Sequence, residues 1–531
     1  MGFLQKISTT RLVLIVAAFL TLTGNTKFFS ETLVVYPWSD NTLFIISLSI
    51  WLFSLLAILL LIVSYRYSVK PILITLLLVS SIVSYFANNY GIVIDDNMIA
   101  NSMETNMAES MDLFSFNLVL YFLILGVMPA YWVYQVRMTH SNISQQLWSK
   151  LKAIVILIVV FIVVTLVFSK SYTSFARENK QLRLHINPTY YLYAMGKHIN
   201  SKFKTATLPF NEIGRDAKIV RNSNNQKLII VVAGETARAD RFSLNGYHRQ
   251  TNPLLAKENV ISFKQMSSCG TDTALSLPCM FSSLNREDYS HAQGKNMSNV
   301  LDILSYTGVE VLWRDNNSSS KNVADRLPFQ DYKSDTINTV CDIECRDEGM
   351  LSDLQQYIDK HNNKDILIVL HTMGSHGPAY YKRYPKKFEH FTPVCETNQL
   401  NECTNEQINN AYDNTIVYTD YILSKTIGFL KNNQDKYRTA MFYMSDHGES
   451  LGEKNLYLHG MPYFIAPKEQ THVASILWLD DQFSEEVNMQ LLNQNSDKAL
   501  SHDGLFHTLL GLMDVKTNIY DQDLDFIANE K

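Results

Sequence analysis

The stretch RTAMFYMSDHGESLG, residues 438–452, joins an apolar run to a group of polar residues. The apolar part is short and unbroken, which is typical of a strand buried on both faces of a parallel sheet. Asp446 and His447 follow it, and Glu449 comes two residues later. The stretch therefore predicts a carboxylate and an imidazole side by side at the point where a buried strand ends.

Four further runs have the same character, and helical stretches separate them. The runs are QKLIIVVAGE (226–235), GVEVLWRD (308–315), KDILIVLHTMG (364–374) and HVASILWLDD (472–481). Strands that alternate with helices predict an α/β domain with a mostly parallel sheet covered on both faces. We expect this domain to occupy residues 216–531. In such sheets, ligands bind at the carboxyl ends of the strands.

The residues after these apolar runs are carboxylates and imidazoles. They are Glu235, His371, His376, Asp446 and His447, and His459 follows in the segment YLHGMP. Each one alone would more often cap a helix or form a structural hydrogen bond. Together at one sheet edge they form a ligand set for a divalent cation, zinc above all. Adjacent Asp446 and His447 can both reach one metal ion from a loop at the end of a strand.

A candidate nucleophile lies in SSCGTDTALSLPCMFSS, residues 267–283. Thr271 and Thr273 precede an apolar helical pattern, and the backbone N–H groups of a helix N-terminus favour a phosphate or a developing oxyanion. A hydroxyl bound to zinc loses its proton more easily, so a threonine there is a usable nucleophile near neutral pH. Both threonines could instead be helix N-caps and nothing more. The spacing alone does not choose between them.

Five long apolar runs precede residue 172. They are TRLVLIVAAFLTLTGN (10–25), TLFIISLSIWLFSLLAILLLIV (42–63), PILITLLLVSSIVSYFA (71–87), LFSFNLVLYFLILGVMPAYWVY (113–134) and KAIVILIVVFIVVTLVF (152–168). A membrane-spanning helix needs roughly 20 apolar residues, which the last four runs satisfy. The first run is either a cleaved signal peptide or an uncleaved span, and the lack of a small-x-small cleavage pattern favours the span. The sequence therefore predicts a transmembrane domain of five helices at residues 1–172.

The charges between the runs predict the orientation of the chain. Lysine and arginine occur before the first run, between the second and third runs, and between the fourth and fifth. The segment between the third and fourth runs contains aspartate and glutamate but no lysine or arginine. The positive-inside rule then places the N-terminus in the cytoplasm and everything after residue 172 outside it. Basic and aromatic residues mix at 175–199. We therefore interpret residues 173–215 as an interfacial linker or, alternatively, as a surface helix of the catalytic domain.

All six cysteines lie in the second half of the chain, outside the apolar runs. An even number of cysteines in an exported domain indicates disulfides, because that compartment is oxidising. Six cysteines allow 15 pairings. Sequence proximity favours Cys269 with Cys279, Cys341 with Cys345, and Cys395 with Cys403. A thiolate zinc cluster is disfavoured, since no pair has the two-residue spacing of such sites. The net charge of −5 gives no sign of a nucleic acid partner.

Seven longer motifs make the sequence recognisable. They are VVAGETARADRFSLNGY (231–247), SCGTDTALSLPCMFS (268–282), VLWRDNNSSSKNVADRLP (311–328), CRDEGML (345–351), GSHGPAYYKRYP (374–385), FTPVCE (391–396) and SDHGESLGEKNLYLHGMP (445–462). In this order they resemble the phosphoethanolamine transferases that modify lipid A, the family that includes the transferable colistin-resistance enzymes. The resemblance implies a catalytic domain of the alkaline-phosphatase/sulfatase fold behind five membrane helices. It also implies the inner membrane of a bacterium, with the catalytic domain in the periplasm.

The resemblance assigns roles to residues within these motifs. The implied zinc ligands are Glu235, Thr273, Asp446 and His447. Thr273 would also be the nucleophile, a choice that the spacing leaves open. Asn317 and Lys321 match positions that hold the phosphate of the donor.

Two histidines and the cysteines complete the implied site. His376 and His459 match positions that contact substrate or a second zinc ion, and either could serve as the catalytic acid or base. The family pairs neighbouring cysteines. Cys341 and Cys345 lie closer together than their counterparts in the colistin-resistance members, so this loop departs from the family pattern.

The implied reaction has two steps and two lipid substrates. Thr273 takes phosphoethanolamine from phosphatidylethanolamine, and a phosphate of lipid A then accepts it. A membrane-embedded monomer is expected. The alternatives are an acceptor in the core sugars of lipopolysaccharide or another glycan, a phosphoglycerol transferase, and a sulfatase or phosphatase of the same superfamily. A membrane-anchored metal-binding receptor without activity is an alternative of another class.

Overall fold

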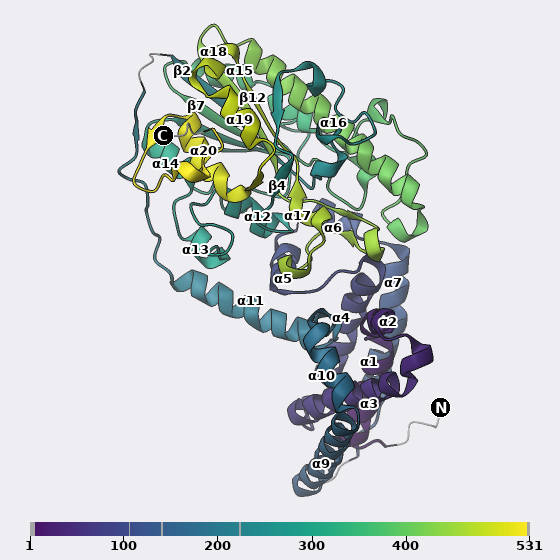
Figure 1. The fold of residues 1–531 in the computed structure, drawn as a ribbon. Coiled ribbons are helices and arrows are strands. Elements are labelled where there is room, and N and C mark those ends of the chain that lie inside the picture. Colours follow the sequence, from purple (N-terminus) through teal and green to yellow (C-terminus); the bar gives the residue numbers. More distant parts are fainter. Residues whose placement is uncertain (1–5, 106, 140–141, 222–224, 528–531) are drawn as a thin grey trace. The chain divides into compact units, whose positions relative to one another are not determined.

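The computed structural model describes residues 6–105, 107–139, 142–221 and 225–527 (Figure 1). The chain divides into two compact units. Residues 1–96 and 114–197 form the first, which we call the helical unit, and residues 97–113 and 198–531 form the second, the sheet unit. The segment 97–113, which lies between the third and fourth apolar runs, is therefore grouped with the sheet unit.

Within the described residues, four helical segments of the helical unit are long and apolar enough to cross a membrane. They cover Trp38–Val63 (α3), Val69–Tyr90 (α4), Phe116–Gln135 (α7, η1 and α8) and Ile143–Val167 (α9). These helices correspond to the last four apolar runs. Ile156, Val159 and Val163 of α9 are exposed, as expected of a surface that would face lipid.

The first apolar run folds differently from a single straight span. Helices α1 (Thr9–Thr23) and α2 (Thr26–Val35) meet at 50° and qualify as a span only together. Asn25 lies between them, is fully buried, and donates to the carbonyl oxygens of Leu20 and Asn187. A buried amide whose partners lie on two segments fixes this bend.

A seven-stranded sheet organises the sheet unit, with the strand order β3-β12-β8-β2-β7-β5-β6. The strands are β2 (Gln226–Gly234), β3 (Val260–Ser262), β5 (Glu310–Asp315), β6 (Phe329–Asp331), β7 (Ile366–His371), β8 (Tyr437–Ser445) and β12 (Ser475–Leu479). Six of them run in the same direction, whereas β12 runs antiparallel to its neighbours β8 and β3. The carboxyl end of β12 therefore lies at the edge opposite to the ends of β2, β7 and β8.

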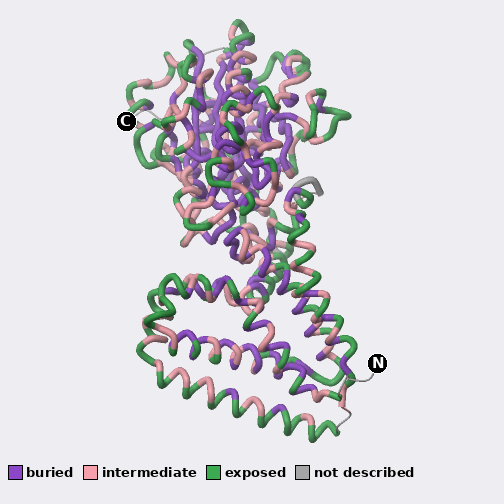
Figure 2. The backbone as a smooth tube through the Cα atoms, turned by 90° about the vertical axis from the view of Figure 1, so that its right-hand side faces the viewer, coloured by how far each residue is buried: buried purple, intermediate pink, exposed green. Residues whose placement is uncertain are grey.

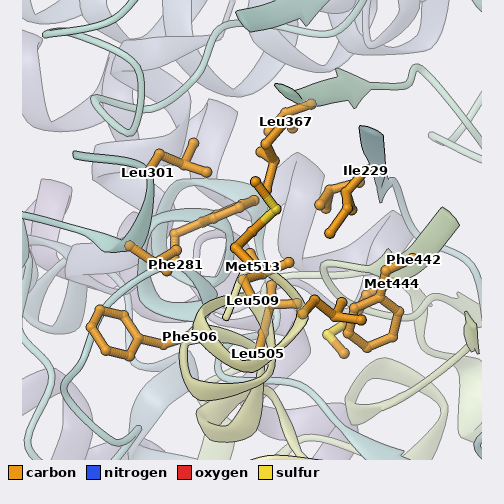
Figure 3. Close-up of a cluster of buried hydrophobic side chains, with 14 of the residues drawn as sticks. Ile229, Phe281, Leu301, Leu367, Phe442, Met444, Leu505, Phe506, Leu509 and Met513 are labelled. Atoms are coloured by element: carbon orange, nitrogen blue, oxygen red, sulfur yellow. The ribbon is translucent and has the colours of Figure 1, made fainter. Parts of the chain in front are cut away.

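Helices cover both faces of this sheet. The helices are α12 (Thr273–Met280), α14 (Val300–Tyr306), α15 (Leu354–Lys360), α16 (Asn405–Lys431) and α20 (Leu505–Leu512). On one face, Ile229 and Phe442 pack with Leu509 of α20 in a fully buried cluster (Figure 3). Tyr443 points to the other face, where α16 contacts β8. The central strands β2, β7 and β8 are accordingly buried on both faces, and buried residues dominate the interior of the sheet unit (Figure 2).

Shorter elements complete the two units. Helical segments are α5 (Asp96–Glu104), α6 (Met107–Asp112), α10 (Ser169–Glu178), α11 (Thr189–Thr207), α13 (His291–Lys295), α17 (Lys468–Thr471), α18 (Asp481–Glu486) and α19 (Met489–Asn495). A small sheet joins β11 (His472–Val473), β4 (Gln265–Ser267) and β13 (Ala499–Ser501). Two strand pairs remain: β1 (Lys218–Ile219) with β14 (Val515–Lys516), and β9 (Ser450–Leu451) with β10 (Tyr457–Leu458).

Candidate metal centre

Two neighbouring parallel strands bring three predicted ligands together. β2 and β8 pair in register as far as Gly234 and Ser445, so the next residues, Glu235 and Asp446, leave the sheet side by side. Glu235, Asp446 and His447 are fully buried, and one potential ligand atom of each lies within 4.8 Å of the others. The Nε2 atom of His447 lies 3.3 Å from Oε1 of Glu235 and 3.4 Å from Oδ2 of Asp446.

Thr273 reaches the same point from α12. Asp272 caps this helix by accepting from the backbone N–H of Leu275, which makes Thr273 the first helical residue. The hydroxyl of Thr273 donates to Oε2 of Glu235 at 3.1 Å and lies 3.3 Å from Nε2 of His447. Thr271 instead donates to the carbonyl oxygen of Met461. The structure thus distinguishes the two threonines that the spacing left open, because only Thr273 lies with the carboxylates and the imidazole.

The donor set fits a divalent cation such as zinc. Oδ2 of Asp446 is buried and has no hydrogen-bond partner among the described residues, although a buried carboxylate oxygen normally requires one. The Nδ1 atom of His447 donates to the carbonyl oxygen of Gly448, so Nε2 is the nitrogen that faces the cluster and would bind a cation once its proton is displaced. Two carboxylates, an imidazole and a hydroxyl around one point match the number and most of the types of ligand in a four-coordinate zinc site.

The electrostatics of the cluster also favour a cation. Burial, and after it the negative charge of Glu235, raises the pKa of Asp446 to about 6. Burial alone would lower the pKa of His447, but the charges of Asp446 and Glu235 raise it to about 10. Burial would raise the pKa of Glu235 as well, yet the hydrogen bond and positive charge of His447 lower it. A site that draws a proton onto its imidazole has surplus negative charge, which a bound cation would neutralise.

Asn317 lies beside the centre and contacts one of its carboxylates. Its amide nitrogen donates to Oε2 of Glu235 at 2.7 Å and to the carbonyl oxygen of Thr372 at 2.9 Å. Asn317 therefore fixes the orientation of Glu235 in this structure. Lys321, four residues further on, is nearly buried and has a backbone φ of +48°. The expected contact of both residues with a donor phosphate stays a prediction.

His376 and His459 lie next to the centre. The ring of His459 is 4.4 Å from that of His447 and 5.5 Å from that of His376, measured between centroids. Nδ1 of His459 lies 3.3 Å from Oε1 of Glu449, a fully buried carboxylate. The sequence reasoning did not assign Glu449 a role, although it lies three residues after Asp446.

His371 follows an apolar run but belongs to a different interaction. Its Nδ1 atom donates to Oδ2 of Asp315 at 2.9 Å, and the indole N–H of Trp313 donates to the same oxygen. His371 is not a member of the group of described residues whose ligand atoms lie together. Its buried partner Asp315 explains why a histidine occurs at the end of β7.

The loop after β7 is held by a buried carboxylate. Asp347 accepts from the backbone N–H groups of Met373 and Gly374 and from the side chain of Asn316. Gly374 has φ of +51°, and a Cβ atom there would lie 2.7 Å from the carbonyl oxygen of Glu235. A glycine is therefore required where this loop passes the metal centre.

Arg383 connects His376 to two more distant carboxylates. Its Nε atom donates to the carbonyl oxygen of His376 at 2.7 Å. Its other nitrogens pair with Asp112, from the segment between the third and fourth membrane runs, and with Glu344. The guanidinium is almost completely buried, and the two carboxylates balance its positive charge there. The backbone of His376 is thereby tied to two segments far away in the sequence.

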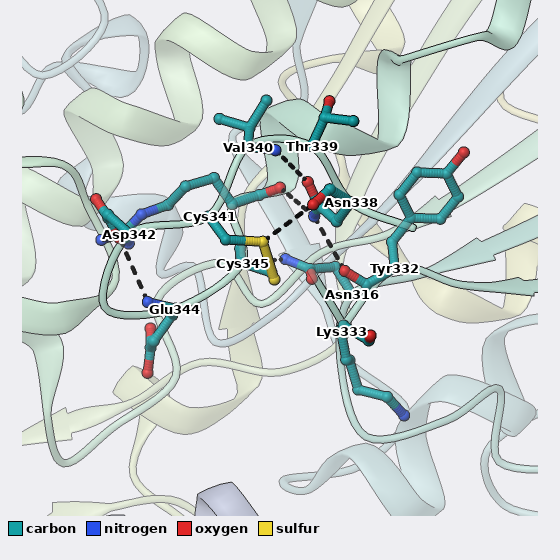
Figure 4. The surroundings of a disulfide bond; sticks show 12 residues. Asn316, Tyr332, Lys333, Asn338, Thr339, Val340, Cys341, Asp342, Glu344 and Cys345 are labelled. Atoms are coloured by element: carbon teal, nitrogen blue, oxygen red, sulfur yellow. Dashed lines mark hydrogen bonds and ion pairs between the residues drawn. A yellow bond between two sulfur atoms is a disulfide. The ribbon is translucent and has the colours of Figure 1, made fainter. Parts of the chain in front are cut away.

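Three disulfides pair neighbouring cysteines within the described residues. They are Cys269–Cys279, Cys341–Cys345 and Cys395–Cys403. The first encloses the start of α12 and therefore Thr273. The short Cys341–Cys345 loop carries Glu344, and the carbonyl oxygen of Cys345 accepts from Asn316 (Figure 4). This loop thus supports both Arg383 and the strand end before Asn317.

Comparison with known proteins identifies the family. Residues 52–203 match the family model described as phosphoethanolamine transferase EptA/EptB, and residues 227–515 match the model described as sulfatase. The phosphatidylethanolamine transferase Mcr-2 of Escherichia coli is 44% identical over 513 residues, which is 94% of each chain. The phosphoethanolamine transferase EptA of Escherichia coli strain K12 is 40% identical over 520 residues, which is 96% of this chain and 94% of EptA.

A solved structure covers both units. The integral membrane protein lipooligosaccharide phosphoethanolamine transferase A (EptA) from Neisseria meningitidis superposes with a TM-score of 0.95 at 33% identity, over 98% of this chain and 99% of that chain. The predicted fold class is confirmed: apolar helices precede a sulfatase-type domain with a mostly parallel sheet. The chain belongs to the family of phosphoethanolamine transferases that includes Mcr-2 and EptA.

Proposed function

We propose that this chain transfers phosphoethanolamine from phosphatidylethanolamine to a phosphate of lipid A, with Thr273 as a covalent carrier. The observation that carries the proposal is the position of the Thr273 hydroxyl, which lies 3.1 Å from Glu235 and 3.3 Å from His447 at the start of α12. Membership of a family whose members are named for phosphoethanolamine transfer supports the same reaction.

In the first step, Oγ1 of Thr273 attacks the phosphorus of phosphatidylethanolamine. A bond from Oγ1 to phosphorus forms, and the bond from phosphorus to the diacylglycerol oxygen breaks. Glu235 accepts a hydrogen bond from the Thr273 hydroxyl and is placed to receive its proton. His376 or His459 supplies the proton that the diacylglycerol oxygen takes up. Zinc held by Glu235, Thr273, Asp446 and His447 would acidify the hydroxyl and balance the negative charge of the phosphate oxygens.

In the second step, a phosphate oxygen of lipid A attacks the same phosphorus. A bond from that oxygen to phosphorus forms, the bond to Oγ1 breaks, and Thr273 takes back the proton held by Glu235. The histidine that protonated diacylglycerol recovers a proton from the acceptor phosphate. The ammonium group of Lys321 balances negative charge near the transferred group, and the backbone N–H groups at the start of α12 favour it as well. Two half-reactions through one covalent enzyme intermediate require ping-pong kinetics.

The membrane domain is explained by the two lipid substrates. We propose that residues 1–172 span the inner membrane with the N-terminus in the cytoplasm, and that residues 216–531 act in the periplasm as a monomer. Residues 173–215 would then lie along the membrane surface. Four candidate spans with a bent helix pair, and three disulfides in the sheet unit, support this arrangement.

A sugar acceptor is the second candidate. The Kdo(2)-lipid A phosphoethanolamine 7''-transferase of Escherichia coli strain K12 is 30% identical over 299 residues, which is 54% of this chain. Mcr-2 matches more of the chain at higher identity. We therefore favour a phosphate of lipid A as the acceptor over a sugar hydroxyl or another glycan. The position of the added group on the product separates the two.

The test is mass spectrometry of lipid A from cells that produce the wild type, Thr273→Ala or Thr271→Ala. We expect a phosphoethanolamine-sized addition with the wild type and none with Thr273→Ala, a loss of about 10³-fold or more. Thr271→Ala is the matched control, because Thr271 lies in the same loop but bonds to Met461. Equal modification by the wild type and Thr273→Ala would remove Thr273 from its role.

A further inference from the structure

An apolar groove lies within the helical unit, between α3 and α4. Its lining includes Leu56, Leu59 and Val63 of α3 together with Pro71 and Leu76 of α4. The groove has a volume of about 680 Å³, which is within the range of about 300–1,000 Å³ typical of sites that hold a small ligand. The side chains of Leu59 and Val63 are 42% and 48% exposed, so the groove is open to the surroundings of the unit.

The start of α11 also lines the groove, and the chemistry of the whole lining is that of a hydrocarbon. Pro188 precedes α11, and Leu192 lies in its first turn. Apart from Thr75 and Thr189, the described lining residues are apolar. The hydroxyl of Thr189 donates to the carbonyl oxygen of Ile186 at 3.2 Å. A polar ligand would lose its hydrogen bonds to water here with little in return, so the groove favours a hydrocarbon chain.

The groove reaches the turn that joins α3 to α4. Val63 is the last residue of α3 and Pro71 lies in the first turn of α4, so lining residues flank the turn at 64–68 on both sides. The sequence of this turn, SYRYS, contains Arg66 but no aspartate or glutamate. Arg66 is exposed, and its guanidinium carbon lies 5.4 Å from the ring centre of Tyr67. Arginine and tyrosine at such a turn are typical of the head-group region of a bilayer.

We propose that this groove binds one acyl chain of an anionic phospholipid, with the phosphate of the head group at Arg66. Helices in a membrane associate by van der Waals packing, and a groove between them that stays empty loses those contacts. An acyl chain restores them, which holds this lipid more firmly than its neighbours in the bilayer. The positive charge at the end of the groove favours an anionic head group over a zwitterionic one.

The proposal rests on the membrane placement proposed above for residues 1–172 and adds a lipid site that takes no part in the transfer. In that placement, the turn at 64–68 lies on the cytoplasmic side of the membrane, whereas phosphoethanolamine is transferred in the periplasm. The lipid in the groove is therefore neither donor nor acceptor. Its effect is on the stability of the helical unit, because a ligand that binds only the folded state stabilises that state.

The groove and the turn can be tested separately. Leu59→Trp fills part of the groove without a change of charge, so we expect the affinity for phosphatidylglycerol to fall about 10-fold or more. Arg66→Gln removes the charge from an exposed turn, so the affinity for phosphatidylglycerol should fall about 5-fold, with no change for zwitterionic phosphatidylcholine. Arg66→Lys should retain the preference, because it retains the charge. Val159→Trp is the matched control, since Val159 is exposed on α9 and does not line the groove.

The experiment uses the full-length chain purified in detergent micelles. Native mass spectrometry counts the phosphatidylglycerol molecules that stay bound to each chain, and titration with phosphatidylglycerol or phosphatidylcholine gives the two affinities. Thermal unfolding without added lipid shows whether each variant keeps its fold, and the rise in Tm with phosphatidylglycerol reports binding to the folded state. Release of diacylglycerol from labelled phosphatidylethanolamine is measured in parallel, and it tests the proposed function separately.

One firmly bound phosphatidylglycerol in the wild type and in Val159→Trp, with weaker binding in Leu59→Trp and in Arg66→Gln, supports the site. Equal binding by the wild type and a folded Leu59→Trp would overturn it, as would equal affinity of the wild type for the two lipids. If Leu59→Trp does not fold, Arg66→Gln decides, because its substitution lies on an exposed turn.

Two further results would assign the groove to another occupant and overturn the proposal. Loss of diacylglycerol release in a folded Leu59→Trp would assign the groove to the donor lipid. Conversion of a wild-type dimer into a Leu59→Trp monomer would assign it to a second copy of the chain. A wild type that binds phosphatidylglycerol in the groove but releases no diacylglycerol contradicts the proposed function and leaves the lipid site intact.

Discussion

The metal centre and the pair of lysines that faces Glu104 differ in what holds their side chains. Glu235 and Asp446 follow paired central strands, and each has fixed partners in a fully buried environment. Lys295 and Lys321 come from a short helix and a loop, and their common partner Glu104 is one-third exposed. The proposed nucleophile is therefore surrounded by fully buried groups that follow the central strands, whereas the two lysines share a carboxylate that is partly open to solvent.

The largest expected effect comes from a substitution in the metal centre. Asp446→Asn removes a charged ligand whose Oδ2 atom has no hydrogen-bond partner among the described residues. We expect loss of the bound zinc and a fall in transfer of about 10³-fold or more. Zinc per chain is measured by elemental analysis of the purified protein, alongside lipid A modification.

The control for this experiment is another buried aspartate. Asp480 caps α18 at the opposite end of β8 and contacts the backbone of Thr439. Asp480→Asn should lose stability but keep its zinc content. Unchanged zinc in Asp446→Asn would show that the carboxylate is not a ligand. The contrast between the buried metal centre and the partly exposed lysine pair would then lose its basis.

We expect an intermediate effect from Arg383, which links a histidine beside the metal centre to the segment that carries Glu104. Arg383 binds the carbonyl oxygen of His376 and also Asp112, in the segment that carries Glu104. Arg383→Lys keeps the charge but loses the planar fork of donors. We expect kcat to fall about 10-fold through displacement of His376, with little change in the KM for either lipid.

The readout for Arg383 is the ratio of kcat to KM effects. A structural defect would lower the amount of folded enzyme but leave the KM and the pH dependence of the remaining activity unchanged. A displaced His376 should shift the pH profile of kcat, since this histidine is proposed as an acid or base. Wild-type kinetics in Arg383→Lys would show that His376 does not depend on this contact.

We expect the smallest effect from a residue that lies outside both the metal centre and the pair of lysines. Burial raises the pKa of Asp420 to about 6, even though its oxygens accept from the backbone N–H groups of Leu254 and Leu255. A raised pKa in the folded state means that protonation favours folding, so this contribution is greatest at low pH and is lost as the pH rises through 6. Between pH 7 and pH 5, the wild type should gain about 1 kcal/mol relative to Asp420→Asn.

The measurement is chemical unfolding of the wild type and Asp420→Asn at the two pH values. The difference between the two proteins removes the other titrating groups from the comparison. Transfer activity should be similar in both, because the partners of Asp420 are the backbone N–H groups of Leu254 and Leu255, which are not part of the metal centre. A stability difference that does not depend on pH would contradict the raised pKa.

The convergence of Glu235, Asp446 and His447 was predictable because parallel strands end at one edge of a sheet. An apolar run carries no information about strand direction, so the antiparallel β12 could not be distinguished from its neighbours. Thr271 and Thr273 differ only in where the first helical turn begins, which the pattern leaves undefined. The family resemblance, not the spacing, chose Thr273.

The sequence did not predict which side chains would contact partners far away in the chain. Glu104 lies in a segment that the hydropathy pattern identifies only as a connection between two membrane runs. Its ion pairs with Lys295 and Lys321 join residues about 190 to 220 positions apart. The bend at Asn25 depends similarly on Asn187. Local patterns predict where strands end, but they do not predict which distant side chains meet.

The wide separation of Glu235, Thr273 and His447 along the chain has a consequence for biogenesis. The site is completed only when β8 has joined β2, because the last ligand follows β8. The proposed metal centre therefore cannot hold an ion tightly before most of the sheet is assembled. Metal uptake would then mark successful folding, and products truncated before residue 447 would leave the metal supply untouched.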